Sequence, residues 1–161
     1  MNFSLAQSEE DFNKAHTKAF INEIQHLLSP EEASLISLND VKQMIKSNAE
    51  TYIGMKVIPI DKIIGSEGRY KDFDNRFFPK STHLKNRWHH VDEAAIKDIT
   101  LPPIKVYELA GLYFVRDGNH RVSVAKARGT EFIDAEVVSL QSEIKLKKAD
   151  SLKEISKQII N

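Results

Sequence analysis

The chain has 161 residues, which is enough for one domain with a buried core and additional extensions. Lys plus Arg and Asp plus Glu both number 23, so the formal net charge is zero and there is no chain-wide electrostatic signal for nucleic acid. The absence of cysteine excludes disulfides, thiolate metal sites and cysteine catalysis. No apolar run approaches the ~18 residues of a membrane span and no signal-peptide core is present, so we expect a cytoplasmic protein without membrane contact.

Residues 1–53 are expected to form a helical extension. Apolar residues from Phe12 to Leu28 recur three or four positions apart, as one helical stripe requires. Ser29-Pro30 should end this helix, because the residue before a proline is pushed out of the helical region. Another helix should begin near Asn39-Asp40, with Val41 on its apolar side. Two interpretations stay open: an extension that packs on the domain or mediates self-association, and a separate effector-binding module.

Residues 54–140 are expected to form the core domain. Lys56 to Ile58 favours a strand, and Pro59 confines that strand to an edge or an end. Ile60 to Ile64 fits either a short strand or a helical turn. The long polar stretch from Gly65 to Pro79 is interpreted either as a loop that covers a ligand or as a packed surface loop, with aromatic residues that can dock it onto the core.

Lys80 to Thr100 is predicted to be a helix. Its core stripe recurs at four, three, four and four residues: Leu84, Trp88, Val91, Ala95 and Ile99. His89 and His90 point about 100° apart on a helix, so we expect no metal site there. Lys85 and Arg87 leave a modestly basic face, which could touch phosphate but is more often only solvated.

A β-hairpin is predicted next, because Ile104 to Leu109 and Leu112 to Val115 are strand-like and Ala110-Gly111 can connect them tightly. Glu131 to Val138 should form a final strand, either through a parallel crossover or in a mixed sheet. Residues 141–161 should form a charged C-terminal helix, either docked on the domain or in contact with a partner, a second copy or nucleic acid.

The segment between the hairpin and the last strand carries the functional signal. Asp117-Gly118 is a turn dipeptide, Asn119 stands where a helix N-cap would stand, and Gly129 is a natural stop for the helix. A helix N-terminus has free backbone N–H groups, so this one is a candidate anion site. Arg121 can bind phosphate through a planar pair of donors, or it can simply pair with Asp117 or Asp134.

Two segments of the chain resemble the ParB/sulfiredoxin-like fold, in its ParB N-terminal-domain-like (ParB-like nuclease) branch. They are IPIDKIIGSEGRYKDF and LPPIKVYELAGLYFVRDGNHRVSVAKARGT. The resemblance covers roughly residues 56–140. It implies a small α+β fold, with a mixed β-sheet core between helical N- and C-terminal extensions. It also implies that the Gly-containing turn and the following helix hold nucleotide phosphates.

In that superfamily the turn binds CTP in partition proteins, ATP in sulfiredoxins and adenine nucleotide in a free-serine kinase branch. Arg121 matches the phosphate-contacting arginine, and His120 matches the residue before it in sulfiredoxins and the kinase branch. Asn119 stands where sulfiredoxins have their catalytic cysteine, so sulfinic-acid reduction is ruled out. Partition proteins have Glu-Arg-Arg at this turn, and no helix-turn-helix is visible.

The turn and this resemblance together predict a nucleotide site. Whether it also has NTP hydrolase or phosphotransferase activity, with Mg²⁺ accompanying CTP, ATP or ADP, stays open. The predicted phosphate-binding residues are Gly118, Asn119, His120, Arg121 and Arg69. The predicted catalytic residues are His120, Asp117 and Glu67, with Asp72 and Asp74 as further loop carboxylates. The predicted partners are a nucleotide, DNA, and a second copy of the chain held through the helical extensions.

Two other classes of function stay open. One is a non-catalytic DNA-associated regulatory or partition-type module, against which the neutral charge and the missing helix-turn-helix weigh. The other is a toxin, phage or operon-specific partner protein that uses the fold as a scaffold.

Overall fold

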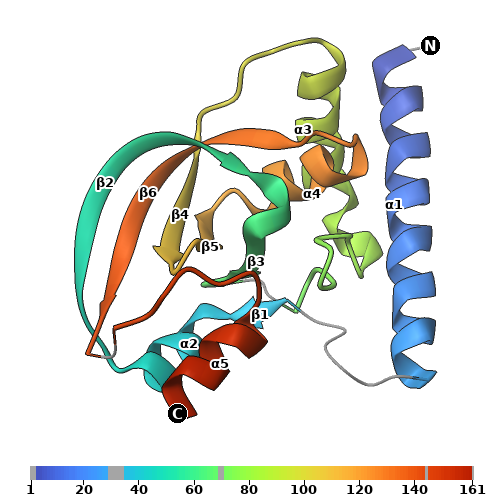
Figure 1. Cartoon of the computed structure of the whole chain (residues 1–161). Coiled ribbons are helices and arrows are strands. Elements are labelled where there is room, and N and C mark those ends of the chain that lie inside the picture. The colour runs from blue at the N-terminus through green and yellow to red at the C-terminus, as the bar shows by residue number, and fades with distance from the viewer. Residues whose placement is uncertain (1–2, 29–34, 69–70, 144, 161) are drawn as a thin grey trace.

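The computed structural model describes residues 3–28, 35–68, 71–143 and 145–160 (Figure 1). The predicted helix end at Ser29-Pro30 lies outside these residues. The described chain forms a mixed sheet of six strands with helices on both faces, which confirms the predicted α+β class with helical extensions.

The six strands lie in the order β1-β3-β5-β4-β6-β2. β4 pairs antiparallel with β5, and β6 pairs parallel with β4 and antiparallel with β2. The other edge is parallel, with β3 on β5 and β1 on β3. The strand bounds are β1 Ile36–Ser37, β2 Ser47–Pro59, β3 Ile63–Ser66, β4 Ile104–Leu109, β5 Leu112–Asp117 and β6 Phe132–Ser142.

Helices cover the two faces of this sheet (Figure 1). α4 packs on one face, and α2 and α5 pack on the other. The bounds of the α-helices in the described chain are α1 Phe3–Leu28, α2 Leu38–Ile45, α3 Lys85–Ile96, α4 Asn119–Ala127 and α5 Leu152–Ile160. Short 3₁₀ turns, Ile60–Lys62 and Thr82–Leu84, precede β3 and α3. No helix in the described residues is both long and apolar enough to cross a membrane.

Alternation along the strands divides the core into two apolar clusters, because successive side chains point to opposite faces of a sheet. Val106 and Val115 lie on the α4 face with Val122, and Tyr107 and Phe114 lie on the α2 and α5 face. The apolar residues of α5 pack against their own sheet, which agrees with the docked alternative for that helix. Pairing of a second copy through the helical extensions stays a prediction.

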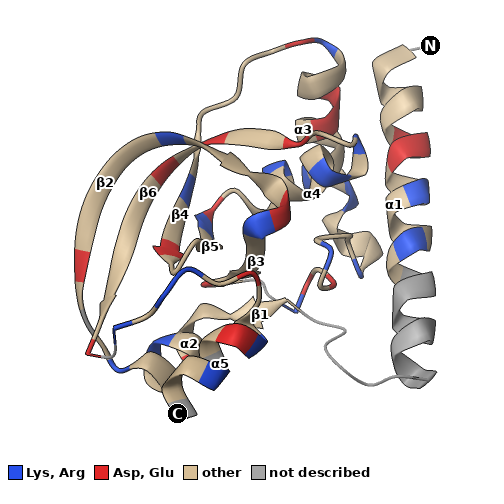
Figure 2. Ribbon diagram, in the orientation of Figure 1, with Lys and Arg blue, Asp and Glu red and all other residues tan. Residues whose placement is uncertain are grey.

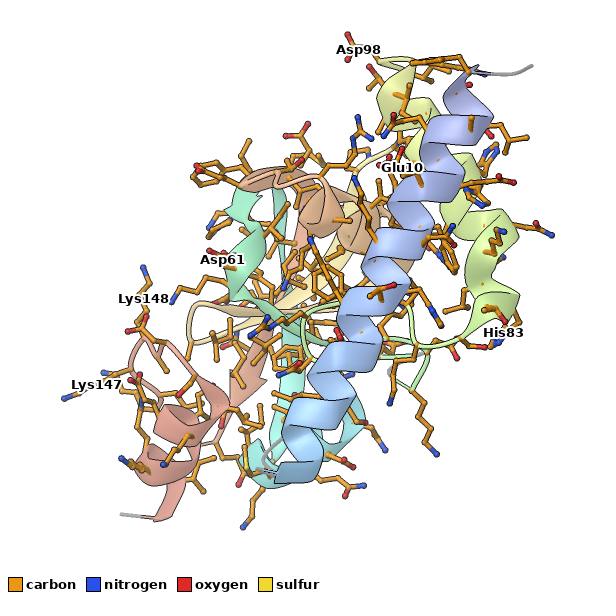
Figure 3. All side chains as sticks on the ribbon, turned by 90° about the vertical axis from the view of Figure 1, so that its right-hand side faces the viewer. Glu10, Asp61, His83, Asp98, Lys147 and Lys148 are labelled. Carbon is orange, nitrogen blue, oxygen red and sulfur yellow. The ribbon has the colours of Figure 1, made fainter. Side chains whose placement is uncertain are left out.

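α1 lies beside α3 and runs in the opposite direction, with His83 near the start of α3 and Asp98 beyond its end (Figure 3). A third cluster joins α1, α3 and α4, and its members include Phe12, Trp88 and Val124. The guanidinium of Arg128 then ties the three helices together, because Nη1 donates to Asp11 Oδ2 at 3.0 Å and to Asp92 Oδ1 at 3.2 Å.

Local signals in the sequence account for the hairpin and for α4. Ala110 and Gly111 both have positive φ, 52° and 85°, as a two-residue turn with the twist of the strands requires. The end of α4 is also as predicted. Gly129 has φ 75°, its N–H bonds the carbonyl of Lys126, and the N–H of Thr130 bonds that of Ala125, so a Schellman motif stops the helix.

Two expectations need correction. The helical prediction for residues 1–53 is wrong where β1 and the start of β2 lie, because β2 runs from Ser47 and pairs along its length with β6. Pro59 is the last residue of β2, which is an edge strand, as predicted. The helix predicted from Lys80 to Thr100 is shorter, since Asp98 has φ 56° and ends it. Of the two alternatives for the last strand, the mixed sheet is present and the parallel crossover is not, because β6 is parallel to β4 and therefore runs antiparallel to β5.

Candidate functional site

The DGNHR turn lies between the end of β5 and the start of α4. Gly118 is the N-cap of α4 and has φ 114°, a conformation that residues with a side chain rarely adopt. This positive φ reverses the chain early, so Asn119 is already helical and the prediction of Asn119 as N-cap is wrong by one residue. The first N–H groups of α4 therefore follow Gly118 directly.

Two side chains also approach the turn closely at Gly118, Ile104 of β4 and Arg121 of α4 itself. A Cβ at this position would lie 2.5 Å from Ile104 Cγ2 and 3.2 Å from Arg121 Nε. Both approaches are closer than ordinary van der Waals contact. The turn thus requires glycine for two reasons, its backbone conformation and the space around it.

Arg121 is held in a fixed orientation. Its Nη2 donates to Asp117 Oδ2 at 2.9 Å, and its Nη1 donates to the carbonyl oxygens of Pro102 and Pro103, the second at 3.1 Å. Its side chain is 17% exposed, against 65% for that of Asp117. The alternative in which Arg121 pairs with Asp117 is therefore present in the structure.

Asn119 and His120 face the loop that follows β3. Asn119 is buried, and its Nδ2 donates to the carbonyl oxygen of Gly68 at 3.3 Å. The imidazole of His120 lies edge-to-face on the ring of Phe73, with 5.3 Å between the ring centroids. The loop is anchored there, because Phe73 and Phe77 are fully buried in the core cluster on the α4 face.

These residues border a cavity of about 320 Å³, which we call the arginine pocket. Its walls bring together five predicted site residues, a glycine of the loop and two further arginines. Arg87 comes from α3, Arg116 from β5 and Arg121 from α4. The described residues that line it are Gly68, Arg87, Arg116, Asp117, Gly118, Asn119, His120 and Arg121.

Sequence reasoning recognised only part of this arginine set. Arg87 was singled out as part of a basic helix face, but nothing along the chain connected it with the turn 30 residues later. Arg116 was missed altogether. Its signal was its position at the end of the strand that leads into the turn, which keeps it beside the start of α4.

Glu67 is not among the described residues that line the arginine pocket. Its backbone N–H donates to the carbonyl oxygen of Val115 at 2.8 Å, which continues the sheet. Burial raises the pKa of the Tyr107 hydroxyl, and the charge and a hydrogen bond of Glu67 raise it further. Tyr107 belongs to the core cluster on the α2 and α5 face, so the Glu67 carboxylate contacts the sheet side opposite α4. Arg69 lies outside the described residues.

Asp74 and Asp72 both help to shape the loop, Asp74 through its carboxylate and Asp72 through its backbone. Asp74 is fully buried, and its Oδ1 accepts the backbone N–H groups of Arg76 and Phe78, both at 2.9 Å. The backbone carbonyl of Asp72 accepts from Lys80 at 2.9 Å. Neither residue lines the arginine pocket. Within the described residues, no group of three or more His, Asp or Glu side chains is arranged to hold a metal ion.

Acidic and basic residues are interspersed along the helices and strands of the described chain (Figure 2). The arginine pocket is thus a local concentration of positive charge on a molecule of zero formal net charge. The chain matches no protein-family model, and neither a curated protein nor a solved structure matches it.

Proposed function

We propose that the arginine pocket binds the phosphate groups of a nucleotide. The observation that carries the proposal is the meeting of Arg87, Arg116 and Arg121, from three separate elements, at the N-terminus of α4. Free N–H groups and the helix dipole favour an anion at that end. Guanidinium–phosphate bonds are charge-assisted and roughly twice as strong as neutral hydrogen bonds.

The balance of charge in the pocket supports a ligand with more than one negative charge. Asp117 is the one carboxylate among the described residues that line it, and this carboxylate is paired with Arg121. Arg87 and Arg116 have exposed side chains, so they can move onto a ligand without disturbing the packing of the core. The resemblance of the turn to the ParB/sulfiredoxin-like superfamily favours a nucleotide over inorganic phosphate alone.

Mg²⁺ would accompany the phosphates, and Asp117 is the pocket residue whose oxygens suit it. His120 is the pocket residue suited to acid–base chemistry, because imidazole exchanges protons near neutral pH. The proposal therefore extends to hydrolysis of the terminal phosphoryl group or its transfer to an acceptor hydroxyl, with His120 in place of Glu67 as the proposed acid–base group.

A thermal-shift screen with CTP, ATP and ADP, with and without Mg²⁺, tests binding. A ligand at 100 times its Kd should stabilise the chain by about 2.7 kcal/mol. Arg87→Ala and Arg116→Ala should each weaken binding about tenfold or more, as expected for loss of a charge-assisted hydrogen bond. Lys14→Ala removes an exposed charge on α1, away from the arginine pocket, and should have no effect.

Two results would contradict this proposal. One is a melting temperature that no nucleotide changes. The other is equal binding by the parent, Arg87→Ala and Arg116→Ala. Phosphate release measured with a nucleotide that binds tests turnover, which His120→Gln should abolish while binding persists.

A further inference from the structure

A second cavity, of about 370 Å³, borders Arg121. We call it the apolar cavity, because most of its walls are aliphatic. Leu101, Pro102 and Pro103 contribute one side from the segment before β4, and Val124 with Ala125 contributes another from α4. Its volume falls within the ~300–1,000 Å³ of small-molecule sites, which are lined in the same way by apolar groups with a few polar ones.

The two cavities share a thin wall. Arg121 lines both of them, and the carbonyl oxygens of Pro102 and Pro103 hold its guanidinium at the border. Gly118 lines the arginine pocket and Ile104 lines the apolar cavity, and a Cβ on the glycine would lie only 2.5 Å from Ile104. A ligand anchored by its charged end in one cavity therefore has the other within reach across Arg121.

In the described lining of the apolar cavity, the polar side chains that are not bonded elsewhere are mainly hydrogen-bond acceptors. Its two arginines are already bonded elsewhere, Arg121 to Asp117 and Arg128 to Asp11 and Asp92. The other polar side chains among its described lining residues are Asp98, Thr130 and Asp134, all exposed. Asp98 projects beyond the end of α3 (Figure 3). Carboxylates only accept hydrogen bonds, so this border favours a ligand that donates them.

We propose that the apolar cavity receives the base of the nucleotide whose phosphates bind the arginine pocket, and that it prefers bases with an exocyclic amino group. The inference rests on the proposed function. The faces of a base are apolar and suit the proline and aliphatic walls. Its amino group donates to Asp98 or Asp134. Cytosine, adenine and guanine each have such an amino group, whereas uracil and hypoxanthine have none and present a carbonyl oxygen where cytosine and adenine have it.

Calorimetric titration with inorganic triphosphate, CTP, UTP, ATP and ITP, all with Mg²⁺, tests the inference. CTP should bind about tenfold tighter than UTP, and ATP about tenfold tighter than ITP, as expected for one hydrogen bond to a charged acceptor. The double variant Asp98→Asn/Asp134→Asn should reduce both preferences. Asn tolerates the positive φ of residue 98, and both side chains are exposed, so folding should be unaffected. Asp40→Asn, on α2 at the opposite sheet face, is the matched control.

Ala125→Leu supplies an independent test, because a larger side chain there enters the apolar cavity from α4. It should bring the affinity for CTP or ATP down to that for inorganic triphosphate, whose own affinity should stay unchanged. Equal affinities for all five ligands in the parent would overturn this inference and leave the phosphate site intact. If none of the five binds, the proposed function fails together with it.

Discussion

Arg121 Nη2 donates to Asp117 Oδ2 at 2.9 Å, which links the first turn of α4 to the end of β5. With its Nη1 on the carbonyl oxygens of Pro102 and Pro103, the guanidinium is oriented before any ligand arrives. An arginine that is fixed beforehand loses little freedom on binding. Under the proposed function, Arg121 is therefore the fixed point of the site, and the exposed Arg87 and Arg116 are the groups expected to close on the phosphates.

Asp117→Asn should increase the affinity for inorganic triphosphate. The change removes the one carboxylate among the described lining residues of the arginine pocket and leaves a side chain of the same size. One charge near a surface phosphate is worth about 1 kcal/mol, so we expect roughly fivefold tighter binding in calorimetry without Mg²⁺. Stability should change little, because an exposed ion pair contributes about 0–1 kcal/mol. Weaker binding of metal-free triphosphate would contradict this account of the pocket.

Gly118→Ala should be strongly destabilising. The new Cβ requires an L-residue at φ 114° and meets Ile104 Cγ2 at 2.5 Å. Backbone strain of roughly 1–2 kcal/mol and overpacking of roughly 1–3 kcal/mol should together lower the free energy of unfolding by about 3 kcal/mol. Urea denaturation measures this change.

Gly129→Ala is the matched control for that substitution. Gly129 also has positive φ, 75°, but no heavy atom lies within 4 Å of the position its Cβ would take. Only the strain of roughly 1–2 kcal/mol should remain. Equal losses of unfolding free energy in the two variants would show that crowding at Gly118 contributes nothing. That result would contradict the close approach of Gly118 to Ile104, and so of the two cavities that they line.

Asp92 should make stability fall as the pH rises through the weakly acidic range. Its burial and the adjacent Asp11 carboxyl raise its pKa to about 7, above the ~3.9 of an unfolded aspartate. The folded state therefore holds this proton more tightly. The resulting stabilisation is complete below pH ~4 and is lost as the pH rises toward 7. Asp92→Asn keeps the side chain uncharged at every pH. The free energy of unfolding of the variant should therefore rise relative to that of the parent as the pH increases over this range.

His89 acts in the opposite direction and has to be separated from Asp92. Burial, with the nearby charge of Lys85, lowers the pKa of His89, so the folded state favours the neutral ring. Its contribution is present above pH ~6.5 and declines as the pH falls. The comparison of parent with Asp92→Asn at each pH cancels this contribution. Parallel pH curves for the two proteins would contradict the assignment of the raised pKa to Asp92.

Ser123→Ala should destabilise the junction of α3 and α4. The Ser123 hydroxyl accepts the indole N–H of Trp88 at 2.9 Å, and both residues are fully buried. Loss of the acceptor leaves a buried donor unsatisfied, which costs about 1–3 kcal/mol. Trp88 is the single tryptophan, so its fluorescence reports the same transition. Ser139→Ala removes a half-buried hydroxyl bonded to Glu108 and should cost less. The reverse order would contradict this account.

The sequence was most informative where the determinants were local. The hairpin turn at Ala110-Gly111, the end of α4 at Gly129 and the helix near Val41 each depend on neighbouring residues, and each was predicted. β2 was recognised only at its last residues. Its partner β6 lies about 80 positions away, and residues 49–53 and 55–57 of β2 are exposed, so they show no clear alternation of apolar and polar residues.

In the candidate site, too, only the contacts between residues close in sequence could be predicted. Residues 117–121 could be identified because one short turn brings them together. Arg87 could not be connected with them, since α3 reaches the pocket only through tertiary packing. The orientation of Glu67 toward Tyr107 also depends on the strand pairing of the residues around it. The carbonyl oxygens that accept hydrogen bonds from Arg121 belong to Pro102 and Pro103, which lie 19 and 18 residues earlier in the chain.

The most direct test of the phosphate site is a calorimetric titration of inorganic triphosphate into the parent and into Arg87→Ala/Arg116→Ala. Both arginines are exposed, so the double variant should keep its fold, which Trp88 fluorescence can verify. The account predicts saturable binding by the parent and affinity at least about 100-fold weaker for the variant, from two lost charge-assisted contacts. Absence of binding by the parent, or equal affinity of the two proteins, would contradict it.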